Sequence, residues 1–225
     1  MQALAATFRV LSDSQTFLEE VRRDSGAPIR VSNLYMCSFA MMSVFGAVMG
    51  AFDGWQQALS SAIKLPVLFL FTIAICFPTL YILMAQVGAK VRAAQLFTVL
   101  VSAVSVASLL LLAFVPVTTF FLVTTTDYQF YKLLNVGLIG VASAFGTGFL
   151  ARGVRQLAGD SPTWASARKV LISWIVLFGF VGTQLGWTLR PFFGAPDRPF
   201  EIVRSVEGNF YSDLLRSVRD VLLFE

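Results

Sequence analysis

The residue types that perform acid–base, nucleophilic and metal chemistry are scarce in this chain of 225 residues. Histidine is absent, which excludes Ser-His-Asp triads, HExxH zinc sites and histidine-ligated haem. The two cysteines, Cys37 and Cys76, fall on neighbouring apolar stretches at depths that differ by roughly 10 Å, too far apart for a disulfide. We interpret both as small buried hydrophobic residues. The sequence therefore predicts no metal, no cofactor and no enzymatic activity.

Composition indicates a membrane protein. Hydrophobic residues make up 56% of the chain and charged residues only 13%, and the mean hydropathy is +0.74. A soluble domain is roughly 45–50% apolar and about 25% charged, because charged side chains cover its surface. The net charge of +4 comes without an arginine-rich run, so we expect no nucleic-acid partner.

Five charge-free apolar stretches predict five transmembrane helices. A helix needs roughly 20 apolar residues to cross the hydrocarbon core, and all five stretches meet this length. The predicted fold class is an all-α polytopic membrane bundle of about five transmembrane helices plus interfacial amphipathic helices. The predicted spans are residues 34–52, 65–89, 94–117, 133–151 and 170–189.

Two prolines interrupt these stretches. Pro78 removes a backbone hydrogen bond in the middle of the second span and predicts a kink there. The third apolar run continues past Pro116, beyond the length of an upright span. We expect its helix to end near Val115 and to be followed by an extended or tilted continuation. A re-entrant hairpin is the alternative.

The spans divide the chain into three parts. Residues 1–32 form a cytoplasmic amphipathic segment, residues 33–189 the transmembrane bundle, and residues 190–225 a structured C-terminal tail. In the first part, residues 12–23 predict a helix that Asp13 or Ser14 caps.

Two further segments have amphipathic spacing. Residues 55–65 place Trp55, Leu59, Ala62 and Ile63 on one helical face, which favours a helix in the outer interface. In the tail, Phe210, Leu214 and Val218 recur at helical spacing and predict a terminal amphipathic helix. That helix either docks on a partner or the membrane interface, or packs on the chain itself.

The distribution of lysine and arginine predicts the orientation. Ten of these residues lie in the N-terminal segment and in the loops after the second and fourth spans, against two in the other loops. Because Lys and Arg gather on the cytoplasmic side, we expect a cytoplasmic N-terminus and an exported tail. Five arginines in the tail argue mildly against its export.

Small residues spaced four apart are the clearest pattern within the predicted spans. Such pairs let helix backbones approach closely, either within one chain or between subunits. They occur in the first, fourth and fifth spans, as Gly46 and Gly50, as Gly140, Ala144 and Gly148, and as Gly182 and Gly186.

The fifth span and the tail carry the candidate contact residues. Gln184 is an amide in an apolar helix, so we expect it to make an interhelical hydrogen bond or to contact a ligand. The chain leaves the membrane at Trp187 and Arg190. The tail that follows is rich in Pro, Gly and Phe, so we expect it to fold back over the outer mouth of the bundle. Arg190, Arg198 and Arg204 would bind lipid headgroups or carboxylates of a partner, or would simply be solvated.

Three segments carry a resemblance to a family. They are KLPVLFLFTIAICFPTLYIL at 64–83, YKLLNV at 131–136, and the pattern GTQLGWTLRPFFGAP followed by EGNFY at 182–211. Together they resemble an uncharacterised family of bacterial multi-pass membrane proteins. The arrangement of five spans with a cytoplasmic N-terminus is also similar to Yip1-type proteins, in architecture only. The resemblance implies a protein of the bacterial inner membrane with no established enzymatic role, and it supplies no catalytic residues.

These observations favour a non-catalytic integral membrane subunit, scaffold or accessory factor of a larger complex. Its expected partners are membrane lipids and either other integral membrane proteins or further copies of the chain. The alternative is a small channel or a transporter of lipid or another neutral solute, in which Pro78, Pro116 and Gln184 would line the path. An intramembrane enzyme is the least supported class, because no base is evident for a Ser, Cys or Tyr nucleophile.

Overall fold

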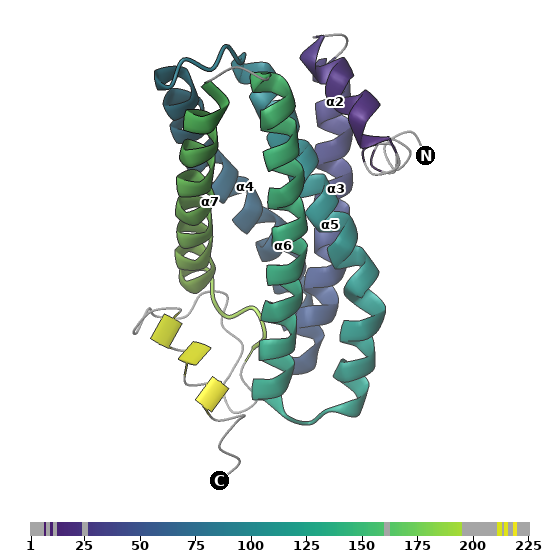
Figure 1. Cartoon of the computed structure of the whole chain (residues 1–225). Coiled ribbons are helices and arrows are strands. Elements are labelled where there is room, and N and C mark those ends of the chain that lie inside the picture. The colour runs from purple at the N-terminus through teal and green to yellow at the C-terminus, as the bar shows by residue number, and fades with distance from the viewer. Residues whose placement is uncertain are drawn as a thin grey trace. The chain divides into compact units, whose positions relative to one another are not determined.

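The computed structural model describes residues 7, 10, 13–23, 27–159, 163–194, 211–212, 214–215 and 218–219. Within these residues every regular element is helical, and Figure 1 follows the helices from purple α2 to green α7. They are α2 (Ser14–Arg22), α3 (Ala27–Gly50), the short 3-10 helix η1 (Ala51–Asp53), α4 (Trp55–Gln86), α5 (Ala93–Thr124), α6 (Tyr128–Ala158) and α7 (Thr163–Thr188).

Five of these helices, α3 to α7, are long and apolar enough to cross a membrane. The prediction of an all-α bundle with five spans is therefore confirmed, and the chain is a multi-pass helical membrane protein. The helices run longer than the apolar stretches that predicted them. At about 1.5 Å per residue α4 and α5 each exceed the ~30 Å hydrocarbon core, so their ends reach into the interfaces.

The structure corrects two predicted boundaries. Helix α5 passes through Pro116 without a break and ends at Thr124, not near Val115. Proline costs the helix one hydrogen bond, but an extended backbone in lipid would leave many groups unpaired. Residues 55–65 are likewise no separate interfacial helix, because they form the first turns of α4.

The contacts of the chain group into two compact units. The first comprises Met1–Ala40, Ile73–Leu110 and Ala142–Gly179. Its core contains Trp174, whose indole Nε1 donates to the Cys76 carbonyl at 2.8 Å. Gly146 of α6 lies so close to α5 that an added Cβ would be 2.8 Å from the Ala103 carbonyl oxygen. Both described cysteines are free.

Helix α2 belongs to this first unit. Asp13 caps it as expected, since its carboxylate accepts from the Thr16 amide at 3.4 Å. Its apolar side chains, Phe17, Leu18 and Val21, are buried on the chain itself. Gln95 of α5 donates to the last carbonyls of α2, at 2.9 Å to that of Arg22. This bond satisfies a helix end that would otherwise lack a donor.

The second unit comprises Met41–Thr72, Leu111–Val141 and Phe180–Glu225. Gly46 and Gly50 of α3 lie directly against α4, where Ser61 and Gln57 face them. Tyr131 of α6 is fully buried, and its hydroxyl donates to the Val48 carbonyl at 3.0 Å. The close approach of α3 and α4 and the bond from Tyr131 to Val48 hold α3, α4 and α6 together. The segment after α7 packs against these helices.

Replacing Gly46 with alanine tests the close approach of α3 and α4. The added Cβ would lie 2.5 Å from the backbone oxygen of Ser61. A backbone atom cannot turn aside as the end of a flexible side chain can, so the two helices would have to move apart. We expect Gly46→Ala to lower the free energy of unfolding by about 1–3 kcal/mol, as over-packing does. Reversible unfolding in mixed detergent micelles measures it.

The matched control is Gly179→Ala in α7. Nothing lies within 4 Å of a Cβ at that position. This variant should be neutral or stabilise by up to about 1 kcal/mol, because alanine has the better helix propensity. Equal effects of the two substitutions would contradict the packing described for Gly46.

Candidate functional site

A short segment after α7 is fastened to one face of α4. We call residues 190–194 the strap, and Gln57, Ser61 and Lys64 the α4 polar stripe. The stripe residues are spaced at i, i+4 and i+7, which places them on a single helical face. All three are buried. They belong to the same compact unit as the strap.

The stripe supplies hydrogen-bond donors to the backbone carbonyls of the strap. Lys64 Nζ donates to the Pro191 oxygen at 2.9 Å, and Gln57 Nε2 donates to the same oxygen at 2.8 Å. The Ser61 hydroxyl donates to the Phe192 oxygen and accepts from Gln57 Nε2 at 3.1 Å. Two carbonyls outside any helix thus receive three bonds from side chains of α4.

Aromatic side chains hold the other side of the strap. The rings of Phe193 and Tyr131 meet edge to face at 6.5 Å, and Phe52 stacks on Tyr131 at 5.0 Å. The Tyr128 hydroxyl donates to the Gly194 carbonyl at 2.9 Å. The strap is therefore attached at both ends, to α4 at Pro191 and to α6 at Gly194.

Position 194 requires glycine for two independent reasons. Its backbone φ is +76°, a left-handed conformation that residues with a Cβ rarely adopt. The place that a Cβ would occupy is already taken by the side chain of Asp53. The end of the strap therefore lies directly against η1.

The strap lies at one membrane boundary. The charge-free part of α4 from residue 65 to 86 rises about 33 Å, close to the hydrocarbon thickness, so Lys64 marks its edge. The connections at 51–54 and 125–127 lie on this same side as the strap, because two membrane crossings separate each from the next. The polar stripe is thus at headgroup depth.

Two polar groups of the stripe lack the partners that buried groups normally have. Lys64 is only 7% exposed, and no carboxylate of a described residue lies within 4 Å of its ammonium group. The centre of the Phe192 ring lies 6.0 Å from the Lys64 Nζ. Gln57 is 1% exposed, and its Oε1 has no hydrogen-bond donor. A buried charge or amide without a partner is costly, so both groups need a complement.

The structure separates the small-residue positions into two kinds. Gly46, Gly50, Gly182 and Gly186 all face α4, the last two beside Thr72 and Leu68 at 3.7 and 3.9 Å from an added Cβ. The α6 positions Gly140, Ala144 and Gly148 are exposed, and nothing lies within 4 Å of a Cβ at either glycine.

The predicted contact residues of α7 and the tail are placed in part. Gln184 is half-buried, and its side chain makes no hydrogen bond within the described part of the chain. Trp187 is buried, with the Arg190 guanidinium 3.9 Å above its ring. Leu214 is half-buried and Val218 is exposed. Arg198, Arg204 and Phe210 lie outside the described residues.

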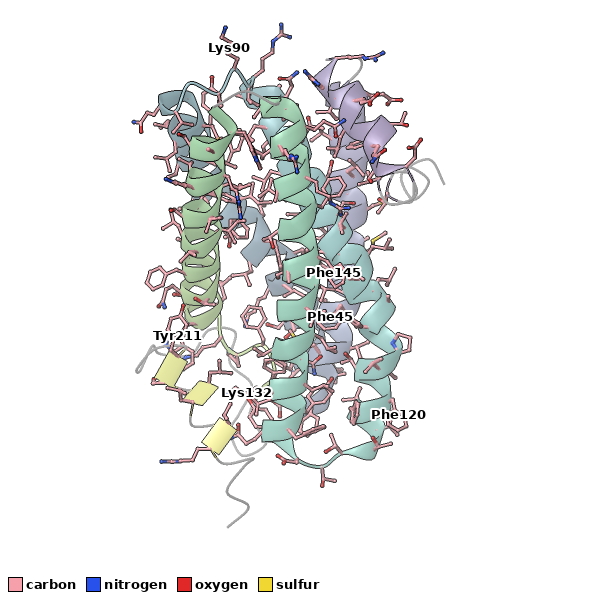
Figure 2. The ribbon with its side chains drawn as sticks, viewed as in Figure 1. Phe45, Lys90, Phe120, Lys132, Phe145 and Tyr211 are labelled. Atoms are coloured by element: carbon pink, nitrogen blue, oxygen red, sulfur yellow. The ribbon has the colours of Figure 1, made fainter. Side chains whose placement is uncertain are left out.

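The tail returns to α7 at Tyr211. Its hydroxyl lies 3.1 Å from the Thr183 hydroxyl, and Figure 2 shows Tyr211 beside the end of α7. Where the tail can be followed, it contacts the bundle of its own chain. The prediction that the tail folds back over the outer mouth of the bundle concerns residues that lie largely outside the described ones.

The sequence pattern did not predict the α4 polar stripe, because Lys64 is one of the two cations that the charge distribution assigns to the sparsely charged loops. The signal was nevertheless present. The three polar residues share one helical face, opposite the apolar face of Trp55, Leu59 and Ile63. The structure leaves those three apolar side chains exposed.

Among the described residues, no group of three or more His, Cys, Asp or Glu side chains is arranged to hold a metal ion. The stripe offers a cation, an amide and a hydroxyl, which are groups that bind polar ligands. Comparisons with protein-family models, with curated proteins and with solved structures found no match. Family membership therefore stays a prediction.

Removing the Gln57 amide tests whether the stripe holds the strap. Gln57→Leu deletes one buried bond to Pro191, worth about 1 kcal/mol, so amide hydrogen exchange in residues 188–194 should accelerate about fivefold. Hydrogen–deuterium exchange with mass spectrometry measures it in detergent or nanodiscs. The control is Gln56→Leu, because Gln56 is the exposed neighbour on the same helix. Unchanged exchange in Gln57→Leu would show that the strap does not depend on this bond.

Proposed function

We propose that this chain is a non-catalytic integral membrane subunit or accessory factor of a larger assembly in the bacterial inner membrane. The single observation that carries the proposal is a face of α6 whose residues are exposed and against which no other described residue packs at Gly137, Gly140 or Gly148. An assembly partner would be another integral membrane protein or a further copy of the chain.

The uncovered face combines small and bulky residues. Gly137, Gly140, Ala144 and Gly148 are all exposed, and they follow one another on a single face of α6. Val141 and Phe145 stand beside them, and Phe145 is 61% exposed (Figure 2). Small residues let a second backbone approach, and a neighbouring bulky residue fills the space beside it.

Helix α7 provides the comparison, because we propose that its exposed face contacts lipid. Its exposed residues include Ile172, Val176 and Phe180, and Val176 is 68% exposed. Gly179 is its one exposed glycine. Bulky apolar side chains suit contact with acyl chains, whereas a run of small residues gains most from another helix. The contrast favours α6 as the subunit-contacting helix.

The proposed orientation has the N-terminus in the cytoplasm and the tail outside. It rests on ten Lys and Arg residues in the N-terminal segment and the loops on its side, against two in the loops on the other side. The five arginines of the tail fall on the second side and argue mildly against this orientation. The strap and the α4 polar stripe would then lie at the outer boundary of the membrane.

Filling the α6 face tests the subunit proposal. Gly140→Leu places a large side chain where a partner helix would approach, so the native complex should dissociate while the chain still inserts and folds. Blue-native electrophoresis and mass spectrometry of the co-purified proteins measure the loss, which should be about tenfold or more in retained partner.

The control for this experiment is Gly179→Leu, the same change at an exposed glycine of α7. It should leave the complex intact, because that surface is proposed to face lipid. If both variants kept every partner, the α6 face would have no role in assembly. If both lost them, the effect would be general and not specific to α6.

Cysteine labelling tests the orientation. In a background without Cys37 and Cys76, Thr126→Cys and Ser212→Cys should react with an impermeant maleimide added outside the cell. Lys90→Cys lies on the opposite side of the five spans and should react only after permeabilisation. The reverse pattern would invert the proposed topology.

A further inference from the structure

We propose that Lys64 and Gln57 bind a phosphate-bearing headgroup that also carries a hydrogen-bond donor, as phosphatidylethanolamine and phosphatidylglycerol do. The site lies beside the Pro191 carbonyl, beneath the strap. It is independent of the assembly proposed for α6, because it involves different helices and a different kind of ligand.

The first requirement of the site is an anion. An ammonium group has three donors, and Lys64 uses one of them on the neutral Pro191 carbonyl. The side chain is nine-tenths buried, and the described residues place no carboxylate against it. An anionic oxygen would stabilise this buried cation, whose hydrogen bond is to a neutral carbonyl and which lies 6.0 Å from the Phe192 ring.

The second requirement is a donor. Gln57 Nε2 donates its two hydrogens to the Pro191 oxygen and to the Ser61 hydroxyl oxygen. These two bonds fix the orientation of the amide. Turning the amide over would place Oε1 against the Pro191 carbonyl oxygen, an acceptor facing an acceptor. Oε1 is therefore left as a buried acceptor without a donor.

The two requirements occur at one place. Lys64 Nζ and Gln57 Nε2 bond to the same carbonyl oxygen, so the cation and the amide are neighbours. A ligand that satisfies both must carry an anionic oxygen and an N–H or O–H group a few bonds apart. Phosphoethanolamine and phosphoglycerol groups have this pairing, whereas phosphocholine has the phosphate without the donor.

Membrane depth favours a lipid over a soluble anion. Lys64 directly precedes the charge-free part of α4, at the level where phospholipid phosphates lie. Hydrogen phosphate shares the same chemistry, an anionic oxygen and a hydroxyl, so the experiment must distinguish the two sources.

Lipid-dependent thermal unfolding tests the site. The full chain is purified in detergent, stripped of lipid and titrated with phosphatidylglycerol, phosphatidylethanolamine or phosphatidylcholine of identical acyl chains, or with inorganic phosphate. We expect the first two lipids to raise the Tm at concentrations about tenfold below those that phosphatidylcholine requires. Native mass spectrometry should show one retained molecule of either lipid per chain.

The informative variant is Lys64→Gln, which removes the charge while keeping a donor for Pro191. Its response to the two lipids should weaken about tenfold, and Lys64→Arg should restore part of it. The control is Lys132→Gln at the start of α6, which should respond as the wild type does (Figure 2).

Several outcomes would overturn the proposal. An unchanged lipid response in Lys64→Gln would remove the cation from the site. Equal responses of the wild type to phosphatidylcholine and phosphatidylglycerol would remove the donor requirement, and this comparison needs no variant. Stabilisation by inorganic phosphate with no lipid response would support the phosphate chemistry and overturn the lipid as its source. The α6 variants test assembly separately, so either proposal can fail alone.

Discussion

Inside a membrane, a polar group must find its hydrogen-bond partner within the protein, because the hydrocarbon offers no water. The structure meets this constraint in two ways. Hydroxyls in the spans bond back to their own helices, as Ser38 does to Leu34 and Ser102 does to Thr98. At the strap, which lies at headgroup depth, the carbonyls are buried from water by the protein itself, and side chains of α4 supply their donors. Lys64 and Gln57 are informative because no carboxylate of a described residue lies against the buried Lys64 ammonium, and the buried Gln57 Oε1 has no donor.

Hydropathy predicted the five spans, because twenty consecutive apolar residues have few other uses in a folded chain. Hydropathy did not predict the residues at which the helices end. Helix α5 continues through Pro116 because a helix that lacks one backbone hydrogen bond costs less free energy in lipid than an extended segment whose N–H and C=O groups all lack partners. Residue spacing predicted that Asp13 or Ser14 caps α2, and the structure selects Asp13, since a cap depends only on neighbouring residues. Spacing could not separate Gly46, which meets α4, from Gly140, which meets nothing in the described chain, because the pattern is the same and only the neighbouring helix differs.

The candidate site was less accessible to sequence reasoning than the fold. Gln57 and Ser61 precede the apolar run, so they were assigned to an interface, and their partners lie more than 130 residues away along the chain. Only the folded chain brings the carbonyls of Pro191 and Phe192 to them. The strap and the close approach of α3 to α4 stabilise the second unit. We propose that the α6 face takes a partner helix and that the stripe takes a polar ligand.

The central claim is that this chain is a subunit of a larger membrane assembly. The most direct measurement is purification of the tagged chain, expressed at its native level, in a mild detergent, followed by size-exclusion chromatography with light scattering and mass spectrometry of the peak. We expect a particle larger than one 24.7 kDa chain, with partner proteins or further copies in fixed stoichiometry. A chain that elutes as a monomer with lipid alone would contradict it.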